Sequence, residues 1–157
     1  MSVYNVFEKN VSVPQVGKLK LEQLLTYKKF GKIYIMLGIN ELGYNQEKTL
    51  KKYKDLLKFI QEKQSNAIIY IEANLHVAAE RSNKDKTINN ININKINNEI
   101  SKLADKEKIF FIDVNEKFDD ENGKVMKKSE KQIKNLAYRA RNSLKEILIK
   151  EEFDYEK

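Results

Sequence analysis

Residues 33–37, with the sequence Ile-Tyr-Ile-Met-Leu, form a short apolar run that ends at Gly38 and is followed at once by Asn40 and Glu41. The length of the run, its β-branched and aromatic residues and the glycines on both sides predict a buried strand over residues 32–37. Such strands belong to parallel sheets covered by helices. Ligands bind at the carboxyl ends of parallel strands, so the polar side chains after this run are the first candidates for chemistry.

Two further apolar runs, residues 67–71 and 109–112, have the same character, and each also leads into polar residues. Apolar residues spaced by three and four predict helices between these runs: one from the start signals near Asn45 to Ser65, one over about 87–106, and a last one over 133–148. In the second helix, isoleucines fall on one face and asparagines on the other. Alternating strands and helices predict βαβ units and a parallel sheet of about three strands, which is few for an open sheet.

The remaining segments are less regular. Residues 3–16 are expected to be irregular or weakly extended, and a short helix over 18–29 is expected to end at Gly31. Residues 77–86 and 117–128 read as exposed loops, the latter containing the turn signal Asn122-Gly123. We expect a single domain over residues 1–150 and a frayed tail over 151–157.

Composition excludes several classes of protein. The chain has no cysteine, which excludes disulfides and thiol chemistry. Its net charge is +7, but only three of its 30 basic residues are arginines and they lie among 23 acids. Nucleic-acid binding through the basic segment 127–150 is therefore a less favoured alternative to a solvated helix face. Without a signal or an apolar run long enough to span a membrane, the chain is expected to be soluble and cytoplasmic.

Residues 37–43, Leu-Gly-Ile-Asn-Glu-Leu-Gly, resemble the third conserved block of the GDSL-like, or SGNH, hydrolases, which is written Gly-x-Asn-Asp. The resemblance to a bacterial acylhydrolase of this kind runs over about residues 1–126. It includes the segments 48–64, 66–71, 89–103, 109–114 and 120–123. The resemblance implies a flavodoxin-like three-layer α/β/α fold with a parallel sheet, here expected to be incomplete.

The family's reaction is ester hydrolysis by a serine nucleophile that follows the first strand. A histidine in an Asp-x-x-His block acts as base, and the asparagine of the third block serves in the oxyanion hole. Only Gly38 and Asn40 match this set, and Glu41 stands where the family has aspartate. The chain has no Gly-Asp-Ser, and residues 127–132 contain no histidine. We therefore expect an N-terminally shortened, hydrolase-like protein that does not turn over esters by itself.

Four residues are candidate site residues. Asn40 and Gly38 are interpreted as the remnant of an oxyanion hole; the alternative is that Asn40 only hydrogen-bonds the loop after its strand. Glu41 and His76 are weaker candidates for substrate binding, and His76, the sole histidine, reads more readily as a surface or structural residue than as a relocated base. No serine lies in a nucleophile-elbow sequence, and no metal or cofactor is expected.

A second interpretation is a non-catalytic binding or assembly module. In a flavodoxin-like strand order, a sheet without its first two strands leaves residues 32–37 as an edge, although this strand has the composition of a central one. An exposed apolar edge promotes association. This reading predicts self-association or pairing with a complementary N-terminal fragment.

Overall fold

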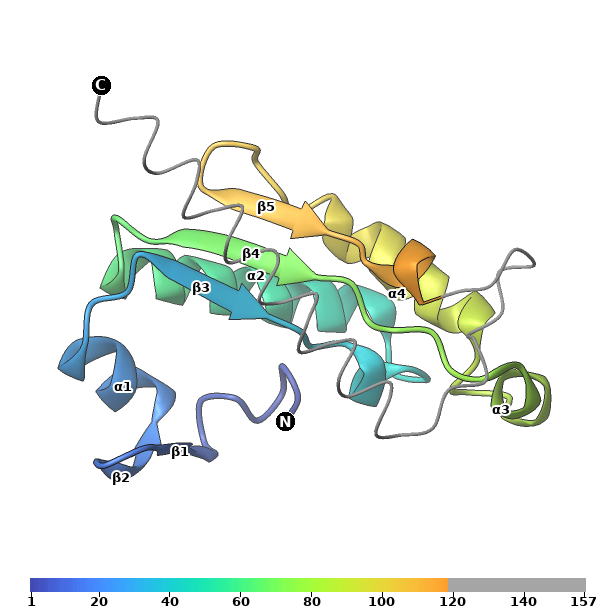
Figure 1. The fold of residues 1–157 in the computed structure, drawn as a ribbon, viewed down its shortest axis with the longest axis horizontal. Coiled ribbons are helices and arrows are strands. Elements are labelled where there is room, and N and C mark those ends of the chain that lie inside the picture. The colour runs from blue at the N-terminus through green and yellow to red at the C-terminus, as the bar shows by residue number, and fades with distance from the viewer. Residues whose placement is uncertain (119–157) are drawn as a thin grey trace. The chain divides into compact units, whose positions relative to one another are not determined.

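The computed structural model describes residues 1–118, and the elements follow one another as shown in Figure 1. The strands are β1 (Asn10–Val13), β2 (Gly17–Lys20), β3 (Lys32–Ile35), β4 (Ile68–Glu72) and β5 (Ile109–Ile112). The helices are α1 (Leu21–Tyr27), α2 (Gln46–Lys63), α3 (Ala79–Lys84) and α4 (Asn90–Ser101), with short 3-10 turns at Ile39–Glu41 and Asn115–Lys117. The predicted final helix, the loop beyond residue 118 and the tail lie outside the described residues.

The three predicted strands form a parallel sheet in the order β3-β4-β5. Their register places Ile33, Ile69 and Ile109 side by side, and the next row joins Tyr34, Tyr70 and Phe110. Successive side chains of a strand point to opposite faces, so one face is aliphatic apart from Phe111 and the other carries the aromatic row. The rings in that row stack, with centroids 5.0 Å apart for Tyr34 and Tyr70 and 5.7 Å for Tyr70 and Phe110.

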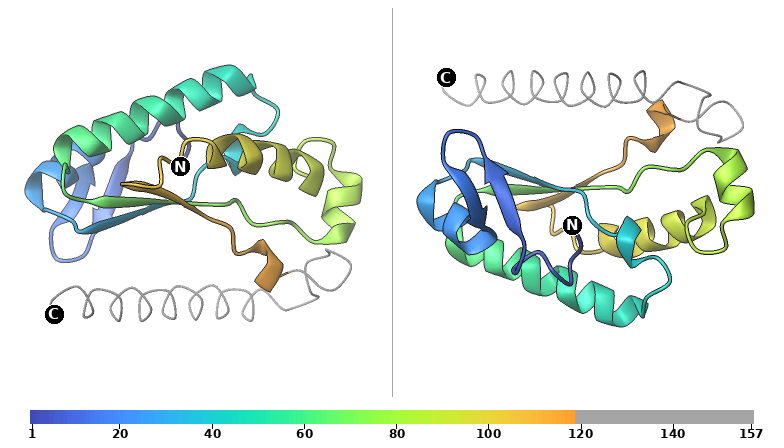
Figure 2. Two further views of the ribbon diagram at one scale, coloured as in Figure 1. Left: turned by 90° about the horizontal axis from the view of Figure 1, so that it is seen from above. Right: turned by 90° about the horizontal axis from the view of Figure 1, so that it is seen from below.

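Helices α2 and α4 cover the aliphatic face of the sheet (Figure 2). Asn45 caps α2, because its side-chain oxygen accepts a hydrogen bond from the backbone N–H of Lys48. The apolar stripe that predicts this helix is its buried face. The core joins residues of α2, α4 and the sheet: Tyr53, Leu56, Leu57, Ile60, Ile96, Ile100, Ile35, Ile69, Ile71 and Ile109. The sheet and this helical layer confirm the flavodoxin-like α/β prediction.

The N-terminal part differs from the predicted pattern. Residues 10–20 form an antiparallel hairpin in which Asn10 pairs with Lys20 and Val13 with Gly17. The predicted helix over 18–29 is wrong at its start, because residues 18–20 pair with β1 and α1 begins only at Leu21. The hairpin turn is made by residues 14–16, with Gln15 and Gly17 both at positive φ.

The segment between β4 and α4 also corrects the prediction. The polar composition of residues 77–86 predicts a loop, but the segment contains α3. Helix α4 begins at Asn90 rather than at 87, because the side chain of Asn89 accepts a hydrogen bond from the N–H of Asn92 and caps the helix there. None of the helices in residues 1–118 is both long enough and apolar enough to cross a membrane.

Candidate functional site

The loop that follows β3 carries three of the four candidate residues. Gly38 has a φ of +131°, a backbone conformation that favours glycine, and it turns the chain into the 3-10 segment Ile39–Glu41. The exposed side chain of Asn40 donates a hydrogen bond from Nδ2 to the backbone oxygen of Met1, at 2.8 Å. The N-terminal segment, residues 1–8, thus lies against the loop that the sequence predicts as the site.

Glu41 is buried and holds the same N-terminal segment through a second hydrogen bond. Its side chain is only 3% exposed, and Oε1 accepts a hydrogen bond from the backbone N–H of Val3 at 2.7 Å. Tyr4 adds a contact between its hydroxyl and Oγ1 of Thr49, 3.1 Å apart. Glu41 was predicted as a weak substrate-binding candidate; in the structure its carboxylate anchors the backbone of Val3.

One oxygen of this buried carboxylate, Oε2, has no hydrogen-bond partner among the described residues. The hydroxyl of Tyr53 lies in the same region. Burial raises the pKa of Tyr53, the backbone of Leu37 opposes that shift, and the negative charges of Glu41 and Glu72 add to it. This phenol therefore stays protonated at any physiological pH, and it is not a candidate base.

Gly38 is in close contact with Asn74, which follows β4. The side chain of Asn74 donates to the backbone oxygen of Leu37 at 3.2 Å, and its Nδ2 occupies the space where a Cβ on residue 38 would lie. The ends of β3 and β4 are therefore tied together by a buried amide. Gly38 is needed here for close packing as well as for its backbone conformation.

Asn74 belongs to a network of three buried asparagines at the carboxyl edge of the sheet. Oδ1 of Asn97 accepts from the backbone N–H of Asn74 at 2.8 Å, and Nδ2 of Asn97 donates to the backbone oxygen of Asn74 at 2.9 Å. Asn115, after β5, donates to the same oxygen at 3.2 Å. The network ties α4 and the ends of β4 and β5 to one another.

Sequence reasoning missed this network. The asparagines of α4 were placed opposite the isoleucine stripe, yet Asn97 is buried between Ile96 and Ile100. The signal was present, because Asn97 lies one turn after Ile93 and one turn before Ile100 on the helix. Its amide offers both an acceptor and a donor, and these bond both backbone groups of Asn74.

His76 lies in the segment between β4 and α3, and its ring contacts α4. Its ring atom Nε2 is 2.6 Å from Oδ1 of Asn94, and its backbone N–H donates to Oδ1 of Asn115. The following residue is held in the same way, since Asn90 exchanges two hydrogen bonds with the backbone of Val77. These bonds give His76 and its neighbours a role in fixing the segment between β4 and α3.

Three of the serine hydroxyls are bonded to the backbone. The hydroxyls of Ser2, Ser82 and Ser101 each form a hydrogen bond with a backbone group of a nearby residue. Within residues 1–118, no three histidine, cysteine, aspartate or glutamate side chains gather as a metal site would require.

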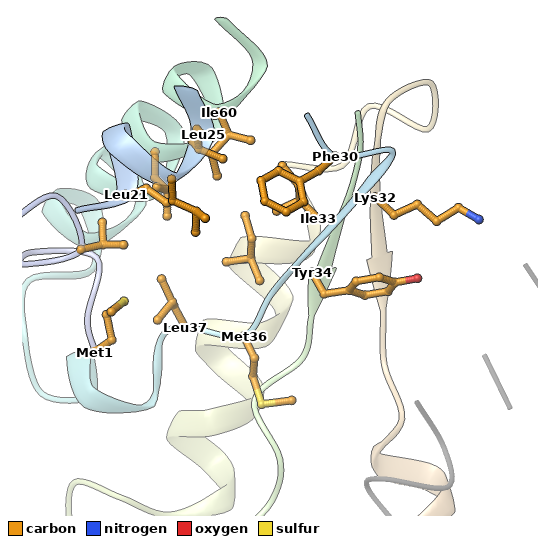
Figure 3. Close-up of a pocket in the computed structure, with 14 residues that line it drawn as sticks. Met1, Leu21, Leu25, Phe30, Lys32, Ile33, Tyr34, Met36, Leu37 and Ile60 are labelled. Atoms are coloured by element: carbon orange, nitrogen blue, oxygen red, sulfur yellow. The ribbon is translucent and has the colours of Figure 1, made fainter. Parts of the chain in front are cut away.

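A groove of about 490 Å³ runs beside β3 (Figure 3). The side chains of Ile33 and Leu37 face those of Leu21 and Met1 across it, whereas Lys32 and Tyr34 point away. All of its lining residues except Lys32 and Tyr34 are aliphatic, methionine or phenylalanine. They are Met1, Val6, Leu21, Leu24, Leu25, Phe30, Lys32, Ile33, Tyr34, Ile35, Met36, Leu37, Leu56 and Ile60.

Comparison with known proteins identifies structural neighbours only, since no family model and no curated protein matches the chain. A Streptococcus pneumonia protein, provisionally described as a platelet activating factor, is similar with a TM-score of 0.55 at 21% identity, over 61% of this chain and 47% of its own. A family two carbohydrate esterase from Clostridium thermocellum, solved with cellohexaose, gives a TM-score of 0.39 at 14% identity, over 64% of this chain and 29% of its own. This chain spans about half the length of the first neighbour. That similarity shows the fold, and the chain has a partial flavodoxin-like α/β fold.

Proposed function

We propose that this chain is an SGNH-type hydrolase-like domain that keeps one wall of the family's ester-hydrolysing site and does not hydrolyse esters by itself. The observation that carries the proposal is the side chain of Asn40, at the carboxyl end of β3, which donates a hydrogen bond to a carbonyl oxygen at 2.8 Å. An oxyanion hole uses the same kind of donor, an amide that donates to an oxygen that becomes negatively charged; here the amide of Asn40 is bonded to the backbone oxygen of Met1.

The absence of turnover follows from what acyl transfer requires. A hydroxyl must be activated by a base within hydrogen-bond reach, and donors must face the developing oxyanion. Asn40 supplies only the last of these. The sole histidine bonds to Asn94 and, through its backbone, to Asn115, so its described contacts serve the segment after β4. A donor without a nucleophile leaves at most the small rate that an oxyanion hole provides alone.

Ester hydrolysis tests this directly. The full chain is incubated with short-chain nitrophenyl esters beside two variants, Asn40→Ala and the exposed control Asn98→Ala. We expect the three proteins to release nitrophenol at one rate, equal to that of a non-enzymatic protein of the same lysine content. Turnover that is robust in the unmodified chain and in Asn98→Ala but lost in Asn40→Ala would overturn the proposal of inactivity.

A second candidate function is favoured by the surroundings of β3. Within residues 1–118 this strand pairs only with β4, and the groove lies along its other side. An apolar edge of this kind is a site for association with another chain. We expect the protein to self-associate or to pair with another polypeptide, and sedimentation velocity tests this. A monomer at all concentrations that also binds no added strand peptide would exclude the association function.

A further inference from the structure

Residues 10–29, which comprise the hairpin β1–β2 and α1, form a segment that we call the flap (Figure 1). Leu25 is the only buried residue among residues 10–29, and the others are exposed or half-buried. Leu21, Leu24 and Leu25 are the contribution of the flap to the lining of the groove beside β3. A segment with a single buried side chain gains little free energy from burial, so its attachment to the core depends on its polar contacts.

The polar contacts of the flap converge on one place. Within residues 1–118, every hydrogen bond and ion pair between the flap and the rest of the chain involves Lys63 or Gln64, at the end of α2. Nζ of Lys63 lies 2.9 Å from Oε1 of Glu22, and the backbone oxygen of Lys63 accepts from Nζ of Lys29 at 3.1 Å. Both contacts are exposed to solvent, so they hold the flap only weakly.

The buried side chain of Gln64 makes the stronger contact. Gln64 is 2% exposed, and its Nε2 donates hydrogen bonds to the backbone oxygens of Leu25 and Lys28. These carbonyls lie in the last turn of α1 and at its C-cap, where the helix itself offers them no partner. Oε1 of the same amide accepts a hydrogen bond from the backbone N–H of Phe30 at 2.9 Å. One buried amide therefore caps α1 and fixes the point at which the chain passes from the flap to β3.

The chain is fixed to the core on both sides of the flap. Before the flap, Val6 is buried, and the backbone N–H of Lys9 donates to the backbone oxygen of Asn5 at 3.0 Å. After the flap, the backbone oxygen of Gly31 accepts from the N–H of Ile68, at the start of β4, at 2.8 Å. These contacts do not depend on the flap, so the flap can leave the core while the sheet stays intact.

We propose that the flap opens and closes as one unit beside β3, and that the side chain of Gln64 is the latch that holds it closed. Leu21 faces Ile33 and Leu37 across the groove, so opening of the flap uncovers these side chains of the strand and its loop (Figure 3). A two-stranded hairpin and a seven-residue helix are not stable alone in water, so the open flap loses its internal hydrogen bonds. Opening requires neither ester turnover nor a ligand in the groove, and the inference therefore goes beyond both proposed functions.

Native-state hydrogen exchange of the full chain, followed by NMR at low urea concentrations, measures the opening. We expect the hydrogen-bonded amides of the hairpin and of α1 to share one opening constant, at least tenfold larger than that of the amides of β4. The urea dependence is expected to be weaker for the flap, because its opening exposes less surface than global unfolding. Separate opening constants for the hairpin and α1 would show that they fray independently, which overturns the single flap. Equal constants and equal urea dependence for the flap and β4 would overturn local opening.

A pair of glutamine variants tests the latch. Gln64→Leu keeps the approximate volume of the side chain and removes its hydrogen bonds, and Gln46→Leu changes an exposed glutamine of the same helix as the matched control. We expect the opening constant of the flap to rise at least tenfold in Gln64→Leu, because the closed flap then keeps carbonyl oxygens that have lost their donor. Gln46→Leu is expected to leave the constant unchanged. The same opening constant in both variants would overturn the latch.

The side-chain amide of Gln64 in the unmodified chain decides the same question if Gln64→Leu does not fold. Its Nε2 protons are bonded to the flap, so we expect them to exchange with the opening constant of the flap amides. The side-chain amide of the exposed Gln46 gives the rate of an unprotected group. Exchange of the Gln64 side chain at that unprotected rate, while the flap amides remain protected, would overturn its role as the latch.

Discussion

A Cβ atom on Gly38 would lie 2.7 Å from Nδ2 of Asn74, a distance that real Cβ atoms do not tolerate. The two residues follow neighbouring strands, and the amide of Asn74 bonds the backbone oxygen of Leu37 just before the glycine. The glycine that marks the predicted site in the sequence is therefore also a packing requirement of the sheet. It makes the loop that presents Asn40 dependent on the asparagine network.

Replacing this glycine tests that requirement. We expect Gly38→Ala to lower the free energy of unfolding by about 2–4 kcal/mol, because the side chain adds backbone strain and displaces Asn74. Gly17 has a φ of +103° with open space around it, so Gly17→Ala measures the cost of backbone strain alone. Gly31 has open space and no positive φ, so Gly31→Ala is the neutral control. Urea denaturation measures all three. A Gly38→Ala cost no larger than that of Gly17→Ala would refute the packing argument.

The asparagine network makes a prediction about α4. Asn97→Ala leaves the buried N–H of Asn74 without its partner and its C=O with only the longer bond from Asn115, and we expect a loss of about 2–3 kcal/mol of stability. The adjacent Asn98 is exposed on the same helix, so Asn98→Ala controls for the change in helix propensity. Equal midpoints for the two variants in chemical denaturation would contradict a structural role of Asn97.

The two side chains that hold the N-terminal segment are expected to differ in their importance. Glu41→Ala leaves the backbone N–H of Val3 buried and unpaired, at a cost of about 1–3 kcal/mol, whereas Glu41→Gln keeps an acceptor and costs less. Asn40→Ala removes an exposed hydrogen bond and costs less than about 1 kcal/mol. We expect hydrogen exchange of the Val3 backbone amide, measured by NMR, to be faster in Glu41→Ala than in Asn40→Ala. Faster exchange in Asn40→Ala than in Glu41→Ala would reverse this assignment.

Asp105 provides a prediction about pH. Desolvation by burial acts to raise its pKa, but the backbone N–H groups of Ile109, Glu107 and Lys108 donate to the carboxylate and together lower the pKa below its ordinary value. A carboxylate whose folded pKa is lowered stabilises the protein above its unfolded pKa, and this stabilisation is lost as the pH falls through the folded value. We expect the stability difference between the unmodified chain and Asp105→Asn to be constant above about pH 5 and to shrink below about pH 4. Thermal unfolding from pH 7 to pH 3 measures it, with Asp55→Asn on the exposed side of α2 as control for the loss of one negative charge.

The elements with the strongest periodic patterns were predictable from the sequence alone. The apolar runs became β3, β4 and β5, and the stripe from Leu50 to Ile60 became the buried face of α2. Local patterns suffice where a whole strand or helix face is buried, since the period of the apolar residues then reports the geometry of the element. The hairpin at residues 10–20 and helix α3 were missed, because their short segments carry few buried residues.

The candidate site likewise combines features that the sequence predicts with features that only the fold creates. The sequence by itself determined the strand that ends at Gly38 and the position of Asn40 after it, because both follow from local backbone preferences and apolar patterning. Only the tertiary structure decided that Asn40 and Glu41 hold the N-terminal segment, that Asn74 requires the glycine, and that β3 borders an apolar groove. The contacts of Asn40, Glu41 and Gly38 join residues more than thirty positions apart in the chain, and long-range contacts of this kind arise from packing that no local pattern encodes.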